Sequence, residues 1–166
     1  MRTYLSLLFV CAAGLSQASY ELLLGVDTTT LSIHRLDPQL NQYLGSFGSG
    51  FVGADSFAIA TDPVAGEVYF SNHSHNRIYV FDYSLGTYKR SWAPNFTHEI
   101  RDLKLIGGKL YAVGGNQLGI YNPNGTTVAS TTITATDGWG VSVNMANEVV
   151  VVGRVVGGSR MYTYNP

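Results

Sequence analysis

The sequence predicts an all-β fold, and three observations lead to this prediction. The composition is poor in charge and rich in glycine and tyrosine, since 13% of the 166 residues are charged, 19 are Gly and 11 are Tyr. Short segments of alternating apolar residues recur along the chain, separated by polar or Gly-rich turns. These segments repeat with a period of about 40–45 residues. Together they favour groups of short antiparallel strands joined by tight turns.

The first 18 residues have the features of a secretory signal peptide. Arg2 precedes an apolar run over residues 5–15, and the small residues Ser16 and Ala18 precede the expected cleavage site. The run is shorter than the ~20 residues that span a bilayer, and a retained N-terminal anchor is the alternative. We therefore expect export, to the medium, the periplasm or the cell surface. Residues 19–166 then form the mature domain, with no membrane span after signal removal.

Charge and cysteine content exclude several classes of protein. Cys11 is the only cysteine and lies in the signal segment, so the mature chain cannot be a small disulfide scaffold. Without Arg2, the remaining 9 basic residues stand against 11 acidic ones, which argues against a nucleic-acid partner. The sequence also carries no complete phosphate-binding or hydrolase motif. These exclusions favour a protein that folds on an apolar core and binds without catalysis.

Four segments of the chain are similar to one another. In each, an alternating strand leads into a short turn and a second strand, and this second strand ends in an acid or its amide: Asp37, Asp82, Asn122 and Asn165. Matching apolar positions lie 45, 40 and 43 residues apart at Ile33, Ile78, Leu118 and Met161. This spacing is typical of the blades of a β-propeller.

Further strands complete the repeat. One precedes three of the units, in "DSFAIATDP", "EIRDLKLIG" and "DGWGVSVNM", and one follows the first three, in "QYLGSF", "TYKRSW" and "TVASTTI". We predict a β-propeller-like array of about four blades of four short antiparallel strands, over approximately 20–50, 54–94, 97–134 and 137–166. The first blade lacks its inner strand and the last its outer strand, so the strands number three, four, four and three. A β-sandwich is the alternative, but it does not explain the constant period.

One blade also resembles a known repeat family. The stretch "FAIATDPVAGEVYFSNHSHNRIYVFD" is similar to an NHL-type blade at Asp62, Gly66, Tyr69, Asn76, Arg77, Ile78, Val80 and Phe81. The third unit keeps part of this pattern at Gly108, Tyr111, Asn116, Leu118 and Tyr121, with Gln117 in place of the Arg. The opening of the mature chain resembles exported bacterial propeller proteins. The resemblance implies a propeller whose blades carry a binding surface.

Acidic residues stand just before each predicted inner strand. They are Asp55, Glu99 and Asp137. Inner strands of a propeller line its central channel, so these carboxylates could form an arc at its mouth and bind calcium or another divalent cation. Gluconolactonase-like propellers use acids and an Asn around a channel metal for lactone hydrolysis, although their full ligand set cannot be mapped onto this sequence. The alternative is that the acids are solvated loop residues or turn caps.

Other polar and aromatic residues give weaker indications of a site. His73 and His75 have a spacing that can ligate a metal, but their position favours the turn of a hairpin. Asn72, Asn95 and Asn124 each begin an Asn-x-Ser/Thr glycosylation sequon. Most aromatic residues are expected to fill the contacts between blades. Trp139 is the exception, because its position beside Asp137 suits ligand binding.

The sequence therefore leaves three functional hypotheses. The leading one is an exported non-catalytic module that binds a protein or glycan partner at the channel mouth. The second is a metal-dependent lactonase or related hydrolase that uses Asp55, Glu99 and Asp137. The third is a structural subunit that self-associates through its incomplete terminal blades, because an open arc exposes an unpaired strand at each end.

Overall fold

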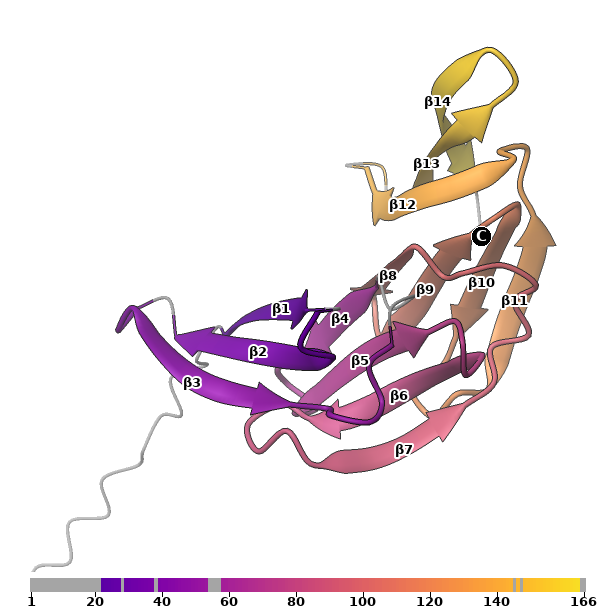
Figure 1. The fold of residues 1–166 in the computed structure, drawn as a ribbon. Helices are drawn as coiled ribbons and strands as arrows, with labels where there is room; N and C mark the ends of the chain where they lie inside the picture. The colour runs from indigo at the N-terminus through magenta and orange to yellow at the C-terminus, as the bar shows by residue number, and fades with distance from the viewer. Residues whose placement is uncertain are drawn as a thin grey trace, which may run out of the picture.

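The described part of the chain consists of strands and turns. A computed structural model describes residues 22–27, 29–37, 39–53, 58–144, 146 and 148–164. Within these ranges fourteen strands form four separate antiparallel sheets, which follow one another along an arc (Figure 1). No helix in these ranges is long and apolar enough to cross a membrane. The all-β prediction is confirmed, and so is the tally of three, four, four and three strands.

Each sheet is one blade, and its strands lie side by side in chain order. Blade 1 contains β1 (Leu23–Asp27), β2 (Ser32–Asp37) and β3 (Gln42–Phe47). Blade 2 contains β4 (Ile59–Asp62), β5 (Glu67–Asn72), β6 (Arg77–Asp82) and β7 (Tyr88–Trp92). Blade 3 contains β8 (Asp102–Ile106), β9 (Lys109–Gly114), β10 (Gln117–Tyr121) and β11 (Thr127–Thr132). Blade 4 contains β12 (Asp137–Val143), β13 (Val149–Val155) and β14 (Gly158–Tyr164).

The polar residue that ends the second strand of each repeat unit shapes the turn that follows. Asp37 Oδ1 accepts hydrogen bonds from the backbone N–H groups of Gln39 and Leu40. Asp82 Oδ1 accepts the equivalent pair from Ser84 and Leu85. Side chains of this kind satisfy backbone donors that the strands leave unpaired. The repeated Asp is therefore a turn former in these two blades.

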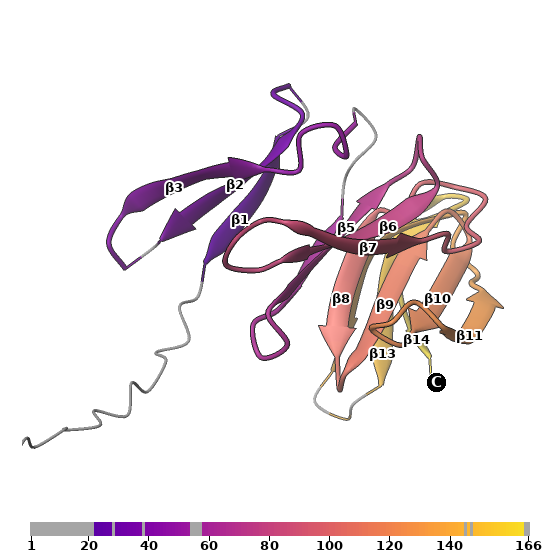
Figure 2. The same ribbon diagram turned by 90° about the horizontal axis from the view of Figure 1, so that it is seen from below.

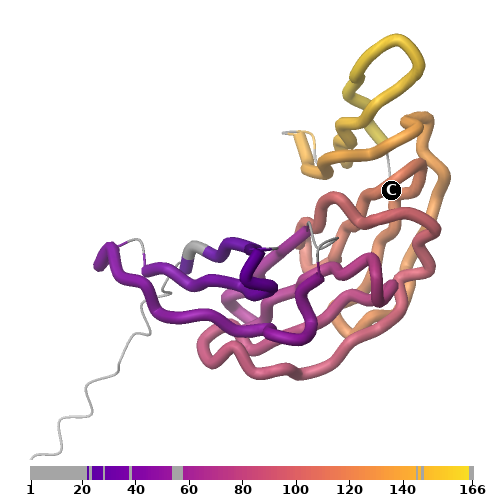
Figure 3. Tube along the Cα trace, viewed as in Figure 1, coloured from indigo at the N-terminus to yellow at the C-terminus, as the bar shows by residue number. Residues whose placement is uncertain are grey.

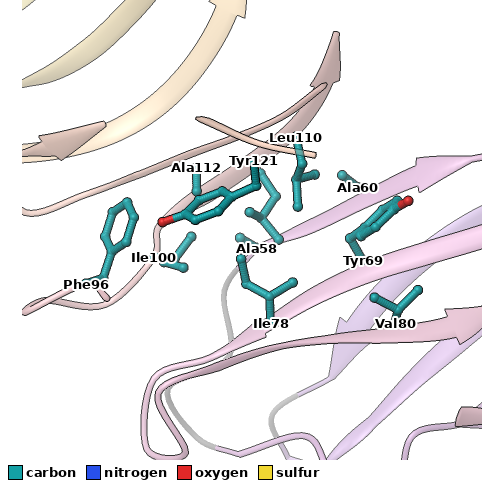
Figure 4. Close-up of a cluster of buried hydrophobic side chains, with 11 residues drawn as sticks. Ala58, Ala60, Tyr69, Ile78, Val80, Phe96, Ile100, Leu110, Ala112 and Tyr121 are labelled. Carbon is teal, nitrogen blue, oxygen red and sulfur yellow. The ribbon is translucent and has the colours of Figure 1, made fainter. Parts of the chain in front are cut away.

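The four blades follow one another along the chain (Figures 2 and 3). The hydrophobic core consists of three clusters, one between each pair of successive blades. In the cluster between blades 2 and 3, Ile78 and Val80 from β6 face Leu110 and Ala112 from β9 (Figure 4). Blades 2 and 3 thus pack a sheet against both of their faces. A two-layer sandwich has no such element, which excludes that alternative.

Candidate binding pocket between the blades

In blades 3 and 4, the residue just before the inner strand is hydrogen-bonded to the second strand of the same blade. Arg101 N–H donates to Val113 O at 2.8 Å in blade 3, and Thr136 N–H donates to Arg154 O at 2.8 Å in blade 4. These bonds continue the sheets beyond the inner strands β8 and β12. As a result, the residues before the inner strands lie beside the hairpin that joins the second and third strands of the blade.

Two glycines in blade 3 allow a close approach at this end. A Cβ atom on Gly114 would lie 1.9 Å from the Glu99 carbonyl oxygen, which no other residue type could accommodate without a backbone shift. A Cβ on Gly115 would lie 2.4 Å from the His98 imidazole, and Gly115 also has a positive φ of 53°. The glycines therefore let Glu99 and His98 lie directly against the β9–β10 hairpin.

This arrangement forms a polar pocket of about 290 Å³ shared by three blades. His73 reaches it from the β5–β6 turn of blade 2, and Asp137 lines it from the start of blade 4. Between them, blade 3 contributes His98, Glu99 and Arg101. The structure thus brings together Glu99 and Asp137, which the repeat alignment selected, and adds His98 and Arg101. Asp55 lies outside the described residues.

Both acids of the pocket interact with neighbouring side chains. Glu99 Oε2 forms an ion pair with Arg101 Nη2 at 2.6 Å. Asp137 Oδ2 accepts a hydrogen bond from Trp139 Nε1 at 2.8 Å, and the Trp139 ring is exposed. The predicted proximity of Trp139 to Asp137 is therefore present in the structure. The indole N–H holds the exposed ring beside the rim of the pocket.

The described side chains do not form a metal site. In the ranges that the structure describes, no group of three or more His, Cys, Asp or Glu residues is placed to hold an ion. Calcium takes six to eight oxygen ligands, whereas Glu99 is paired with a guanidinium and Asp137 with an indole. Of the calcium site that the sequence suggested, only Glu99 and Asp137 are described, and these two carboxylates by themselves do not supply such a ligand set.

His73 and His75 occupy a hairpin turn, as the repeat alignment favoured. Asn76 N–H donates to His73 O at 2.7 Å and closes the turn. His75 Nδ1 lies 2.8 Å from the Tyr79 hydroxyl and 3.2 Å from Asn72 Nδ2. His73 instead lines the pocket on the side of blade 3. The two imidazoles are thus committed to different neighbours.

The three sequons differ in exposure. Asn72 is buried, and its side-chain amide donates to Phe51 O at 2.5 Å. The fold leaves no space for a glycan on this amide, so the sequence-based proposal for Asn72 is corrected. Asn95 and Asn124 are exposed and remain candidate acceptors.

Most aromatic residues fill the contacts between blades. Tyr79 and Tyr83 are buried between blades 1 and 2, and Trp92 packs against the cluster between blades 2 and 3. Tyr162 and Tyr164 pack between blades 3 and 4. Their role is structural, which distinguishes them from Trp139.

Two polar contacts that join blades were missed at the sequence level. Asp102 on β8 accepts a hydrogen bond from Val141 N–H on β12 at 2.9 Å, and burial raises the pKa of its carboxyl. This contact links the inner strands of blades 3 and 4. The only sequence signal was a charged residue at the start of an otherwise apolar inner strand.

The second contact is centred on the buried carboxylate of Glu67. Arg90 donates to both oxygens of Glu67 at 2.6 and 2.7 Å, and Tyr69 donates its hydroxyl at 2.6 Å. The hydrogen bonds from Arg90 are the main reason that the pKa of Glu67 falls to about 2. Arg90 Nη2 also donates to Pro123 O of blade 3 at 2.7 Å. An ion pair inside blade 2 thus extends to the next blade.

Comparisons with known proteins identify the fold. No family model matches the sequence, and no curated protein matches it significantly. Among solved structures, hydrazine synthase from Kuenenia stuttgartiensis aligns with a TM-score of 0.71 at 15% identity, over 86% of this chain and 42% of that one. The WD40 β-propeller domain of Doa1 aligns with a TM-score of 0.69 at 18% identity, over 89% of this chain and 48% of that one.

The WD40 repeats of RRP9 align at 10% identity with a TM-score of 0.68, over 86% of this chain and 47% of that one. The fold is that of a β-propeller. Because the identities are low, these similarities establish the fold alone. The chain spans less than half the length of these structures.

Proposed function

We propose that this chain is an exported, non-catalytic interaction module that binds a basic side chain of a protein partner. The observation that carries the proposal is the pocket that Glu99, Asp137, His73 and His98 line with Arg101. Its volume of about 290 Å³ lies at the lower limit of small-molecule sites, which begin at ~300 Å³. A single side chain is a suitable occupant for a pocket of that size.

The charge of the pocket favours a cation. With neutral imidazoles, two carboxylates stand against one guanidinium, which leaves one negative charge in excess. A lysine or arginine side chain can donate hydrogen bonds to the carboxylates and to the imidazole nitrogens. The exposed ring of Trp139 lines a neighbouring cavity and is joined to Asp137 of this pocket by its indole N–H, so it offers a nearby flat apolar surface that suits a cation or its methylene stem.

The non-catalytic part of the proposal rests on the roles of the reactive side chains. In blade 1, Ser32 Oγ and His34 Nε2 lie 3.2 Å apart, which is the distance of a nucleophile and its base. However, Asp27 Oδ2 approaches the same Nε2 atom, at 3.5 Å, and Tyr43 faces Nδ1. A relay needs the acid on the opposite ring nitrogen. Ser32 is also buried, so this cluster serves the β1–β2 hairpin.

Export and the NHL-like character are supported by the sequence. The apolar run over residues 5–15, followed by Ser16 and Ala18, has the length and flanks of a cleaved signal. The NHL-like positions of blade 2 include Gly66, with a positive φ of 66°, and Ile78, which is fully buried. N-terminal sequencing of the secreted protein should therefore begin at Ser19, and recovery of an intact N-terminus from the membrane fraction would contradict export.

The binding proposal is tested by titrating the purified protein with three blocked tripeptides: acetyl-Gly-Lys-Gly-amide, its Arg analogue and its Glu analogue. NMR chemical shifts of the pocket residues should move with the two basic peptides and not with the acidic one. Glu99→Gln should weaken binding about tenfold, the loss expected for one charged hydrogen bond. The matched control is Glu148→Gln, which makes the same charge change in a turn of blade 4.

A shift of the same residues by a neutral monosaccharide, with none from the basic peptides, would replace the protein partner with a glycan. Turnover of lactones together with a stoichiometric divalent ion in elemental analysis would instead favour the hydrolase hypothesis. Either result would contradict the proposal.

The terminal blades also favour self-association. Leu36, Tyr43, Val152 and Met161 are large apolar residues exposed on blades 1 and 4. Light scattering at increasing protein concentration should detect a species larger than the monomer. A monomeric mass at every concentration would contradict this part of the proposal.

A further inference from the structure

One pair of repeat positions recurs at every contact between blades. The first position is the second residue of strands β2, β6 and β10. It is occupied by Ile33, Ile78 and Leu118. Across each hairpin, Ile78 pairs with Ser71 and Leu118 with Val113. Ile33, Ile78 and Leu118 each lie in the hydrophobic cluster that their blade shares with the following blade. Their exposed fractions are 0%, 0% and 3% for Ile33, Ile78 and Leu118.

The second position faces the preceding blade. Phe81 and Tyr121 are equivalent, because each immediately follows a register shift in its strand pair, and Leu36 follows the same shift in blade 1. Phe81 shares a cluster with Ile33, and Tyr121 shares one with Ile78 (Figure 4). At the third contact, Tyr164, which follows Met161 by three residues as Phe81 follows Ile78, packs on the cluster that contains Leu118. The same two positions therefore meet at all three contacts.

In the part of the chain that the structure describes, the two ends of the arc each present one position without its counterpart. Met161 pairs with Val152 across the last hairpin, as Ile78 pairs with Ser71, and it is 70% exposed. At the other end, Leu36 is 37% exposed, whereas the equivalent Phe81 is 1% exposed. Blade 4 thus carries the apolar face that receives a following blade, and blade 1 carries the face that packs on a preceding one.

We infer that blade 4 of one copy of this chain packs against blade 1 of a second copy, and that two such contacts close a ring. This inference rests on the proposed self-association and specifies its geometry. Met161 of one copy then meets Leu36 of the other, as Ile78 meets Tyr121 within one chain. The contact joins two different surfaces, so two copies close a ring only if each supplies both.

Two further observations support a second copy as the occupant. The four described blades align with 47% and 48% of two WD40 structures, so two sets of four such blades amount to about one ring. Charge also agrees. Asp27 ends β1 at the β1–β2 hairpin of blade 1, and Arg154 lies next to the β13–β14 hairpin on the outer face of blade 4. Head-to-tail packing brings these opposite charges to the same end of the new contact.

Single cysteines test the geometry, because the mature sequence contains none. Met161→Cys and Leu36→Cys proteins are prepared separately, mixed, and treated with a short bismaleimide. We expect cross-linked dimers in the mixture and far fewer in either protein alone. Val64→Cys is the matched control, because Val64 is a fully exposed residue in a turn of blade 2. It should not cross-link with either partner above the background of random collisions.

The outcomes separate the geometry from the association itself. Efficient cross-linking of the Met161→Cys protein alone would mean that two blade 4 faces meet, which overturns the head-to-tail ring and leaves self-association intact. A monomeric mass at all concentrations would overturn both. A charged variant provides an independent test: Met161→Glu should reduce a dimer to a monomer, whereas Val64→Glu should not. Because Met161 is exposed in the single chain, this variant should still fold.

Discussion

The two inner blades and the two terminal blades have similar sequences but very different environments. Four of the six residues of β6 and four of the five residues of β10 are buried, whereas β14, the equivalent strand of blade 4, has five exposed residues among seven. The difference does not come from composition, because the terminal strands keep apolar residues at the equivalent positions, such as Met161. It comes from the number of neighbouring sheets. A blade acquires its core from the blades on both sides, and within the described residues each terminal blade has one such neighbour.

The largest expected effect compares one repeat position in the two environments. Ile78→Ala should lower the free energy of unfolding by about 2–5 kcal/mol, because it leaves a cavity in the core between blades 2 and 3. Met161→Ala should change it by less than about 0.5 kcal/mol in dilute protein, because the side chain is exposed. Urea unfolding followed by tryptophan fluorescence measures both, and equal losses would contradict the comparison.

The next effect concerns two acids with lowered pKa values in different blades. The folded state lowers the pKa of Glu67 from 4.5 to about 2. Between pH 4.5 and about pH 2, Glu67 is protonated in the unfolded chain but still ionised in the folded one. The stabilisation of the folded state by the Glu67 carboxylate is therefore complete above about pH 5 and is lost as the pH falls toward 2. The loss should be on the order of 3 kcal/mol. Glu67→Gln should remove this pH dependence in unfolding measured from pH 2 to 7.

Asp27 of blade 1 is the control for this experiment. Its pKa is also lowered to about 2, by the Thr30 hydroxyl and the backbone N–H groups of Thr29 and Thr30. However, Asp27 lies at a solvated turn, where water competes for the same hydrogen bonds. Asp27→Asn should alter the pH dependence less than Glu67→Gln does. A larger effect of Asp27→Asn would contradict the difference between inner and terminal blades.

The smallest effect concerns the hydrogen bond that attaches terminal blade 4 to blade 3. Burial raises the pKa of Asp102, so its carboxylate is disfavoured in the folded state and its contribution to stability declines as the pH rises through that pKa. Asp102→Asn keeps an acceptor for Val141 N–H and removes the charge, so stability at pH 7 should be unchanged or slightly higher. Asp102→Ala should cost about 1–3 kcal/mol. Thermal unfolding at pH 7 distinguishes the two variants.

The periodic features of the chain could be predicted because they depend on local sequence. Alternation of apolar residues set the strands, and Asp37 and Asp82 marked turns that their side chains form. The same repeat alignment placed Glu99 and Asp137 at corresponding positions, and the structure places both at one pocket. It could not indicate that Arg101 pairs with Glu99, or that His98 lies over Gly115. These contacts depend on how closely the backbone segments approach.

The buried state of Asn72 illustrates the same limit. A sequon is a pattern of three residues, whereas burial depends on Phe51, which arrives from the connection after blade 1. Likewise, nothing local to Glu67 indicates that Arg90, 23 residues later, completes its ion pair.

By itself, the sequence determined the all-β class, the period, the strand tally and the hairpin role of His73 and His75, because each follows from residues that are close along the chain. Only the tertiary structure decided which polar side chains meet, which asparagine is buried and which apolar faces are not covered by another described blade. These properties arise from contacts between residues far apart in sequence. Met161 has one property of each kind. Its repeat position was evident from the sequence, whereas its exposure depends on there being no described blade beyond blade 4.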